Sequence, residues 1–308
     1  MQSNNQNLHI ENRVCLFCSA PAKPVERLPS NVYNGINYGF LRCEKCDLLF
    51  LSKTPDSVQL NVMYSSSYQE ILSHDHFDIS HCMPGMHFSY EKQFDLIRKY
   101  CPSGLALDFG CGNGHFIYHA HKNGINIEGV EFANSVVLEL RAQMPELHFL
   151  IEQEFENSNK QFGLIRLSNV LEHFTNPTEQ FQKLINKLNP NGYILVEGPL
   201  EINTSLVNWF KWGYFRIRLL FNKNYTTSYP PYHIFFSNYR NQLCFFASFG
   251  LKKIVYETKE DVWPFTSSWK EVNSMSSLAK YMLAKTSLII CKIIPRSGNT
   301  FIYVGQKA

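Results

Sequence analysis

The sequence predicts an α/β fold in which a parallel sheet is covered by helices on both faces and is preceded by a small cysteine-rich module. Two observations predict the sheet: strand-like and helix-like stretches alternate between residues 105 and 199, and a glycine-rich turn, LDFGCGNG, contains the end of the first strand. A third observation predicts the module, because two Cys-x-x-Cys pairs, CLFC and CEKC, lie within the first fifty residues.

The composition of the chain limits the classes of function that it can have. The chain has 308 residues, 44% of them hydrophobic, which suffices for one large domain and a smaller module. The formal charge is +3 and the basic residues are dispersed along the chain, which disfavours a dedicated nucleic-acid surface. The opening stretch, MQSNNQNLHIENR, is not a signal peptide, so a cytoplasmic protein is expected.

Residues 278–294 are the longest apolar stretch. They are too short and too charged to span a bilayer comfortably, so no transmembrane segment is predicted. A packed helix is expected there, and a helix lying in the plane of a membrane is the alternative, which leaves peripheral membrane contact open.

The amino-terminal module carries the strongest metal signal. Two tight knuckles can each present two thiolates, and together they complete a tetrahedral Zn²⁺ site on Cys15, Cys18, Cys43 and Cys46. Four thiolates leave no position for water or substrate, so the expected metal is structural. The alternative is a set of buried structural cysteines or a redox pair.

A helix is expected to lead from the module into the first strand. Ser89 is a good cap, and Tyr90, Phe94, Ile97 and Cys101 recur at helical spacing after it.

The first strand, residues 105–109, runs into the glycine turn. Three glycines let the backbone turn at the mouth of a helix expected over 115–122. The third glycine comes one residue too early for a dinucleotide fingerprint, and Asp108 would repel a phosphate. A carboxylate there suits S-adenosylmethionine (SAM), which carries a sulfonium and an amine. A dinucleotide enzyme is the alternative.

The second strand, residues 125–132, ends in Glu131, about twenty residues beyond the glycines, where a carboxylate can accept hydrogen bonds from ribose hydroxyls. A helix over 133–143 and strands over 147–151 and 162–170 follow.

The clearest helix spans 176–188. Asn176 caps it, Pro177 occupies the first helical position, and its apolar residues form one stripe. A fifth strand over 192–199 then completes the alternation, and ligand is expected at the carboxyl ends of the strands.

In the last third of the chain, strand-like and helix-like stretches no longer alternate regularly. Residues 201–232 are rich in aromatic side chains and are expected to form a lid beside the cleft, where they could stack on a sugar, seat an acyl chain or pack on the zinc module. Beyond them we expect a helix capped by Ser237 and closed by Gly250, a strand from about Leu251 and a last strand over 300–307.

LDFGCGNG, GVEFA, LSNVLEHFTNP and LNPNGYILVEGP resemble, in order and spacing, the successive motifs of class I SAM-dependent methyltransferases over roughly residues 88–200. The resemblance implies a Rossmann-like, seven-stranded, mostly parallel sheet whose last strand is antiparallel. CEKCDLLF and the tyrosine-containing linker after it resemble a bacterial subgroup with zinc-binding amino termini, many of whose members act on sugars. Tyr64 and Tyr68 lie where that subgroup often carries tyrosines near its substrate cleft, and packing of the linker onto the core is the alternative.

The resemblance also implies site residues. Asn169 would lie against SAM, and Glu172 and His173 would border the substrate cleft, where bracing the loop is the alternative to a metal or proton-transfer role. The residues expected to bind cofactor are Asp108, Gly110, Cys111, Gly112, Gly114, Glu131, Phe132 and Asn169.

The expected catalytic residues are His233 and His173. His233 precedes the last helix and could take a proton from the acceptor, or else only support the helix entry. The subgroup's sugar C-methyltransferases use a Glu-His pair here for enolisation. This chain has Tyr232-His233, which shifts the expectation toward an oxygen acceptor.

The sequence therefore predicts a SAM-dependent methyltransferase acting on a small molecule, with O-methylation of a sugar or another biosynthetic intermediate preferred. An RNA methyltransferase with a zinc module and a non-catalytic SAM-binding scaffold are the alternatives. The expected division is a zinc module and linker at 1–68, a SAM-binding core at 69–200, an aromatic lid at 201–236 and the rest of the core at 237–308.

Overall fold

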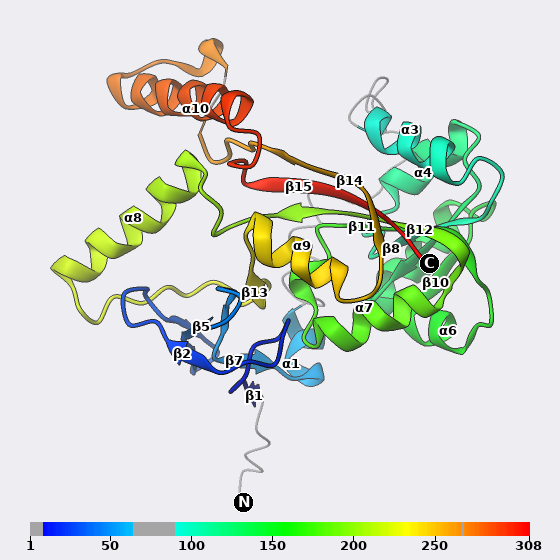
Figure 1. The fold of residues 1–308 in the computed structure, drawn as a ribbon, viewed down its shortest axis with the longest axis horizontal. Coiled ribbons are helices and arrows are strands. Elements are labelled where there is room, and N and C mark those ends of the chain that lie inside the picture. The colour runs from blue at the N-terminus through cyan, green and yellow to red at the C-terminus, as the bar shows by residue number, and fades with distance from the viewer. Residues whose placement is uncertain (1–8, 64–89, 266–267) are drawn as a thin grey trace, which may run out of the picture.

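The fold was analysed in a computed structural model, which describes residues 9–63, 90–265 and 268–308 (Figure 1). Three sequence expectations, Tyr64 and Tyr68 near the cleft and Ser89 as a helix cap, lie outside the described residues. Within them, a central sheet is flanked by helices, with a small β-rich module at the amino-terminal end and two projecting helices at one side.

The central sheet has seven strands in the order β10-β9-β8-β11-β12-β15-β14. Neighbouring strands from β10 to β12 pair in parallel, whereas β15 pairs antiparallel with both β12 and β14. The expected mostly parallel sheet with an antiparallel last strand is confirmed. The strands are β8 (Ala106–Phe109), β9 (Ile127–Glu131), β10 (Phe149–Ile151), β11 (Phe162–Ser168), β12 (Leu188–Pro199), β14 (Lys252–Lys259) and β15 (Thr300–Gln306).

Helices cover both faces because successive residues of a strand point to opposite sides of the sheet. Leu107 and Ile165 belong to one apolar cluster and their neighbours Ala106 and Leu164 to the other. The first cluster includes side chains of α6 (Glu152–Asn157), α7 (Pro177–Asn186) and α9 (Tyr239–Ala247). The second includes side chains of α3 (Glu91–Tyr100), α4 (His115–Lys122) and α5 (Asn134–Gln143).

Local capping chemistry fixes where two of these helices begin. Asn176 caps α7 through Glu179 N, with Pro177 at the first helical position as expected. The expectation that Ser237 caps α9 is wrong. Asn238 is the cap, and its side chain accepts from the N–H groups of Arg240 and Asn241, while the Ser237 hydroxyl is 3.5 Å from the carbonyl oxygen of Pro199.

The amino-terminal module is built from short strands and one helix. Its four-stranded sheet has the order β13-β6-β5-β2, so the later strand β13 (Phe235–Phe236) pairs with β6 of the module. The module elements are β1 (His9–Glu11), β2 (Ala22–Pro24), β3 (Asn31–Tyr33), β4 (Ile36–Tyr38), β5 (Phe40–Cys43), β6 (Leu49–Leu51), β7 (Lys53–Pro55) and α1 (Ser57–Val62).

The module shares its apolar core with the central sheet. Phe17, which lies between the first two cysteines, stacks on Phe245 of α9 with a centroid distance of 4.2 Å and contacts Phe235 edge-on at 4.8 Å. Cys15 and Cys43 belong to a buried cluster that also contains residues of strands β8 and β11. Module and sheet therefore pack as one body.

Two helices, α8 (Leu206–Phe221) and α10 (Met275–Ile293), project together from the side of the molecule (Figure 1). A short 3₁₀ turn over Trp269–Glu271 precedes α10. The segment 260–299, which contains α10, is inserted between β14 and β15, although these strands are neighbours and pair Lys259 with Thr300. Among the described residues, no helix has the length and apolar character to cross a bilayer.

Candidate active site

The glycine turn leads from β8 into α4 as the sequence predicts. Gly110, Gly112 and Gly114 all have positive φ, which other residues adopt only with strain. A Cβ on Gly110 would lie 2.5 Å from Cγ2 of Val170, so this turn also needs glycine for its close approach to the end of β11. The backbone therefore opens a crevice at the carboxyl ends of β8 and β11.

Glu131 closes one side of this crevice at the end of β9. Its Oε2 accepts a hydrogen bond of 2.8 Å from Gly112 N, and its Oε1 accepts from Phe132 N and Ala133 N at 2.8 and 3.2 Å. Burial raises the pKa of Glu131, and these backbone N–H groups oppose the shift by stabilising the carboxylate. The carboxylate is thereby held in one orientation beside the glycine turn.

Asp108 pairs with Arg166 of β11, a partner that the sequence motifs did not indicate. Arg166 donates from Nη1 to Asp108 Oδ1 at 2.7 Å and from Nη2 to Glu197 Oε1 at 2.8 Å. Its guanidinium lies over the Phe116 ring, 3.6 Å from the centroid. Burial raises the pKa of Asp108 and the Arg166 charge opposes this, while the two carboxylates keep Arg166 protonated.

Three carboxylates, Asp108, Glu131 and Glu152, line the crevice together with the one guanidinium of Arg166, which also pairs with Glu197. Arg166 Nε is buried and has no acceptor among the described residues. A bound group that brings both a cation and a carboxylate would match this arrangement of charges.

A single cleft of about 800 Å³ joins the glycine turn to the end of the aromatic segment. Most of the residues expected from the sequence line it: Asp108, Gly110, Cys111, Gly112, Glu131, Phe132, Asn169, His173 and His233. Gly114 does not line it and instead precedes the first turn of α4. Asn169 has a positive φ of 53°, a strained backbone placed at the cleft wall.

At the far end of the cleft two histidines, His173 and His233, line the wall, and the carboxylates of Glu172 and Glu201 lie beside them. His233 Nδ1 lies 3.0 Å from Oε2 of Glu201, a carboxylate just beyond β12 that also pairs with Lys211 at 3.2 Å. The rings of His173 and His233 meet edge to face at 4.9 Å, and His173 Nδ1 lies 2.9 Å from the Tyr232 carbonyl oxygen. The contact with the Tyr232 carbonyl oxygen fixes the orientation of the His173 ring at the cleft wall.

Burial and pairing push the pKa values of this cluster apart. Burial lowers the pKa of His233, but Glu201 and Glu172 outweigh it and raise that pKa to about 9. Burial alone would raise the pKa of Glu201, yet His233 and Lys211 hold it at about 2. Burial and the His233 charge lower the pKa of His173 to about 4, and burial raises the pKa of Glu172 to about 7.

Ligand-type atoms of Glu172, His173 and His233 lie within 4.8 Å of one another, a spacing that a metal ion could bridge. Glu201 raises the pKa of His233, so a cation at this place would compete with the proton of that imidazolium. The two histidines also line the cleft, where they can exchange protons with a bound molecule.

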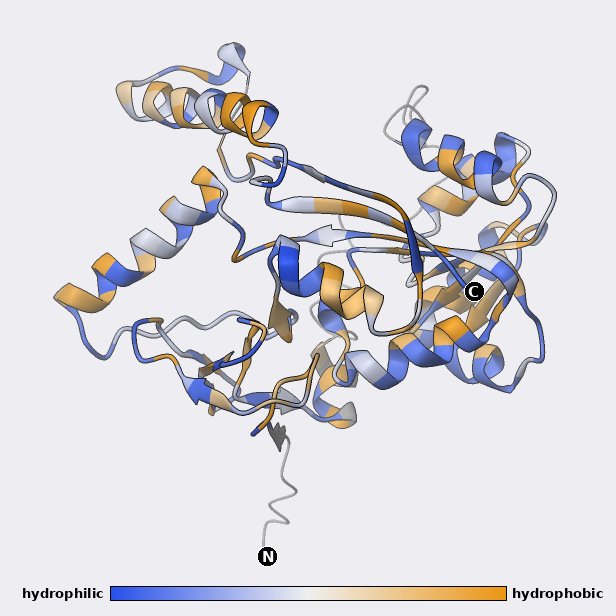
Figure 2. Cartoon of the chain, in the orientation of Figure 1, coloured by the Kyte–Doolittle hydropathy of each residue, from blue (hydrophilic) through white to orange (hydrophobic). Residues whose placement is uncertain are grey.

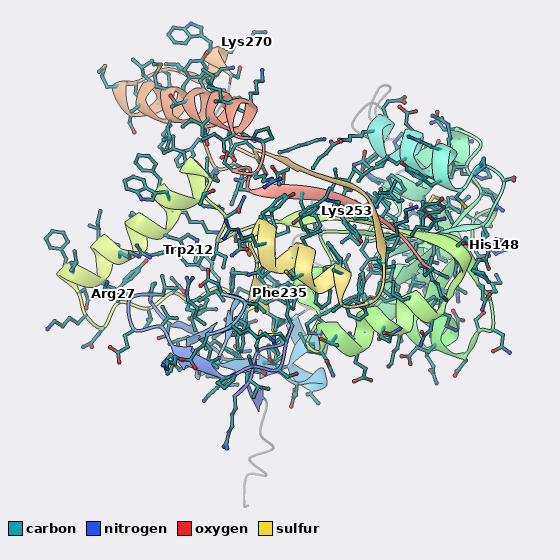
Figure 3. The ribbon with its side chains drawn as sticks, in the orientation of Figure 1. Arg27, His148, Trp212, Phe235, Lys253 and Lys270 are labelled. Carbon is teal, nitrogen blue, oxygen red and sulfur yellow. The ribbon has the colours of Figure 1, made fainter. Side chains whose placement is uncertain are left out.

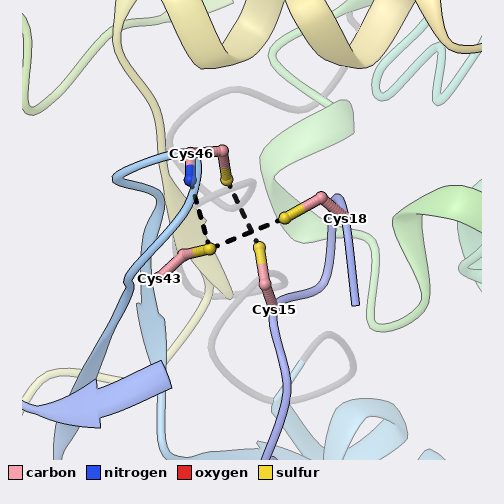
Figure 4. A group of neighbouring side chains, drawn as sticks. All are labelled: Cys15, Cys18, Cys43 and Cys46. Atoms are coloured by element: carbon pink, nitrogen blue, oxygen red, sulfur yellow. Dashed lines mark hydrogen bonds between the residues drawn. The ribbon is translucent and has the colours of Figure 1, made fainter. Parts of the chain in front are cut away.

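The four cysteines of the amino-terminal module converge on one point (Figure 4). Cys15 Sγ is 3.5 Å from Cys46 Sγ and Cys18 Sγ is 3.6 Å from Cys43 Sγ, close to the ~3.8 Å expected between thiolates around a tetrahedral Zn²⁺. Backbone N–H groups of Phe17, Lys45 and Cys46 point at the sulfurs, as they do in zinc knuckles. The donor set fits the metal.

Sequence reasoning missed two residues of the site, Arg166 and Glu201. A buried strand with an arginine in its middle is a signal for Arg166, because such a charge needs carboxylate partners. Glu201 follows the fifth strand immediately, at the edge where ligands are expected, and that position was its only signal.

Comparison with known proteins agrees with this geometry. A family model described as a methyltransferase domain matches residues 91–231. A search of curated proteins finds no match.

Three solved structures illustrate the structural likeness. A SAM-dependent methyltransferase from Archaeoglobus fulgidus is 18% identical, with 72% of this chain and all of that chain covered and a TM-score of 0.40. A protein from Pyrococcus horikoshii OT3 is 12% identical, with 79% and 99% covered and a TM-score of 0.46. The [4+2]-cyclase SpnF is 13% identical, with 82% and 96% covered and a TM-score of 0.49.

All three identities are below 20% and all three TM-scores are below 0.5, so the family match, the strand order and the cleft carry the conclusion. The glycine turn, the carboxylates at the ends of β8 and β9 and the antiparallel β15 stand where the motifs predicted them. Residues 91–231, a little under half of the chain, therefore form a methyltransferase domain.

Proposed function

We propose that the protein transfers the methyl group of SAM to a hydroxyl of a small molecule, a sugar or another biosynthetic intermediate. The observation that carries the proposal is the cleft itself, which has an acidic glycine turn at one end and a Glu-His pair at the other. SAM supplies a methyl group on a sulfonium, and the protein supplies alignment, exclusion of water and a proton acceptor.

The proposed SAM-binding site consists of the residues expected from the sequence, together with Arg166. Asp108 would take the amine, Glu131 the ribose hydroxyls, and Arg166 Nε, which lacks an acceptor among the described residues, the carboxylate. The remaining members are Gly110, Cys111, Gly112, Gly114, Phe132 and Asn169.

His233 is the proposed base. Because Nδ1 faces Glu201, the other ring nitrogen is directed away from that carboxylate, and the side chain lines the cleft. In the molecules in which His233 is neutral, the acceptor hydroxyl would give its proton to this histidine as its oxygen bonds to the methyl carbon. The methyl–sulfur bond would break, S-adenosylhomocysteine would leave, and Glu201 would stabilise the resulting imidazolium. His173, neutral at pH 7, is proposed to hydrogen-bond the acceptor.

Zn²⁺ is proposed for Cys15, Cys18, Cys43 and Cys46 as a structural ion. We also propose the functional division into a zinc module and linker at 1–68, a SAM-binding core at 69–200, an aromatic lid at 201–236 and the remaining core at 237–308. Of the lid, Tyr232 and His233 line the cleft. Trp212, labelled in Figure 3, contacts Phe40 of the module edge to face.

A carbon acceptor is the second candidate, and Glu201 is the observation that favours it. The sequence favoured an oxygen acceptor because the residue before His233 is a tyrosine and not a glutamate. In the folded protein, however, Glu201 lies against that histidine. A base of this kind could also remove a proton from carbon next to a carbonyl.

The test is to incubate the protein with methyl-labelled SAM and with cell extracts separated into metabolite and RNA fractions. We expect label in a metabolite, and carbon-13 spectra of that product separate an O-methyl from a C-methyl group. His233→Asn should lower kcat/KM by about 10²–10⁴, and His148→Asn, an exposed histidine away from the cleft (Figure 3), should leave it unchanged.

Label confined to RNA would replace the proposal with the RNA methyltransferase alternative. SAM binding without label in any fraction would favour the non-catalytic scaffold. Full activity of His233→Asn would remove the base assignment while leaving the methyltransferase assignment standing.

A further inference from the structure

Helices α8 and α10 expose an unusual amount of apolar surface. Among the described side chains of α8, none beyond Asn208 is buried, and Leu220 and Phe221 are 81% and 88% exposed. In α10 only Ala284 and Ser287 are buried, and Met275 is 81% exposed. Figure 2 shows apolar residues along both helices, which project to one side of the central sheet. Surface of this kind marks an interaction site.

The two helices act as one surface because they contact each other and share an anchor. Glu260, at the end of β14, accepts hydrogen bonds from Ser205 Oγ, the cap of α8, at 2.6 Å and from Ser287 Oγ of α10 at 2.5 Å. We define the α8–α10 face as the exposed residues of the two helices and of the chain next to their ends, residues 206–224 and 272–297.

Charge on this face has one sign. Residues 206–224 and 272–297 contain eight lysines and arginines and no aspartate or glutamate. Since the chain has 29 basic and 26 acidic residues, 21 basic residues oppose 26 acidic ones elsewhere. The net positive charge of the protein therefore comes from a face that is rich in exposed apolar side chains.

We propose that the α8–α10 face binds the surface of an anionic lipid bilayer. Exposed aromatic and aliphatic side chains would enter the interface, while lysines and arginines extend their charged ends to the lipid phosphates. No described helix is able to span a bilayer, so the helices would lie on the membrane.

Two other occupants fit the face less well. A nucleic acid would pair with the cations and stack on Trp209 or Tyr214, but it offers nothing to the exposed aliphatic side chains of Ile217, Leu220 and Ile293. A second copy would bring two faces with only positive charges together, which costs free energy. A bilayer with anionic headgroups satisfies both the apolar and the basic residues.

The experiment is co-sedimentation of the full chain with phosphatidylcholine vesicles that do or do not contain phosphatidylglycerol. We expect binding to the anionic vesicles, weakening as salt is added, and at least about tenfold weaker binding to phosphatidylcholine alone. The double variant Leu220→Glu/Phe221→Glu should lose at least about tenfold in vesicle affinity.

Matched controls separate the face from general effects. Leu138→Glu places the same change on α5, at a side chain 65% exposed, and should bind as the unmodified protein does. Lys223→Glu and Lys280→Glu should each weaken binding about fivefold, whereas Lys253→Glu on β14 should not. Circular dichroism melting verifies that each variant is folded.

Absence of binding to anionic vesicles overturns the proposal, as does an equal loss in the Leu138→Glu control. Light scattering after size exclusion tests the second copy: a dimer that dissociates in Leu220→Glu/Phe221→Glu also overturns it. The proposal is also overturned if the protein binds single-stranded RNA but not vesicles and the Leu220→Glu/Phe221→Glu variant loses that RNA binding.

Discussion

At the residue scale, the Glu201–His233 pair sets how activity should depend on pH. With its pKa at about 9, His233 is mostly protonated at pH 7, so the fraction able to accept a proton rises about tenfold per pH unit below that value. We predict that kcat/KM rises up to about pH 9 and then levels off.

Glu201→Gln tests the cause of this profile. Removing the carboxylate removes the charge that stabilises the imidazolium, so the inflection should move to lower pH by about 1–2 units and the plateau should fall. Glu146→Gln, an exposed carboxyl between α5 and β10, serves as the matched control. An unchanged inflection in Glu201→Gln, measured by initial rates across pH, contradicts the role of the pair.

Residues of the site differed in how readily the sequence revealed them. Gly110 and Glu131 were identified because the glycine turn and the end of the second strand are encoded locally, by glycines and by an apolar run, whereas Asn169 followed from the family resemblance. Arg166 lies 58 residues from Asp108 and Glu201 lies 32 residues from His233, and no local pattern encodes such pairs. Only the sheet order brings them together.

At the element scale, helix α9 offers a direct comparison of two neighbouring residues. Asn238→Ala removes the acceptor for Arg240 N and Asn241 N and should lower the free energy of unfolding by about 1 kcal/mol. Ser237→Ala, at the position that the sequence suggested as the cap, should cost less, because its hydroxyl makes only a 3.5 Å contact. Urea unfolding of both variants measures the difference, and the reverse ranking would contradict the cap assignment.

The remaining elements show where local rules are sufficient. The helix over 115–122 was predicted to the residue, and α7 was predicted at its start, because glycine, proline and asparagine mark those ends. The antiparallel β15 followed only from the family resemblance. The lysines and arginines that look dispersed in the sequence gather on α8 and α10 because the two helices, far apart in the chain, fold beside each other.

At the scale of the whole molecule, the cysteine cluster should stabilise more than its own module. Phe17 packs between Phe235 and Phe245, so loss of metal would disturb the core around α9. We predict about one zinc per chain by elemental analysis. Chelation should lower the melting temperature of the entire protein by about 10 °C in a single transition.

Cys46→Ser should reproduce the effect of the chelator, and Cys244→Ser, an exposed free cysteine on α9, should not. A separate early transition for the module, with the main transition unmoved, would show that the two parts are energetically independent.

The neighbouring placement of β14 and β15 has a consequence for how such an enzyme can diversify. Because Lys259 and Thr300 pair directly, the chain leaves and re-enters the sheet at one spot, and the intervening residues can be shortened, replaced or grafted without altering strand order. Where the enzyme works in the cell and what chemistry it performs could thus evolve as separate traits on a single scaffold.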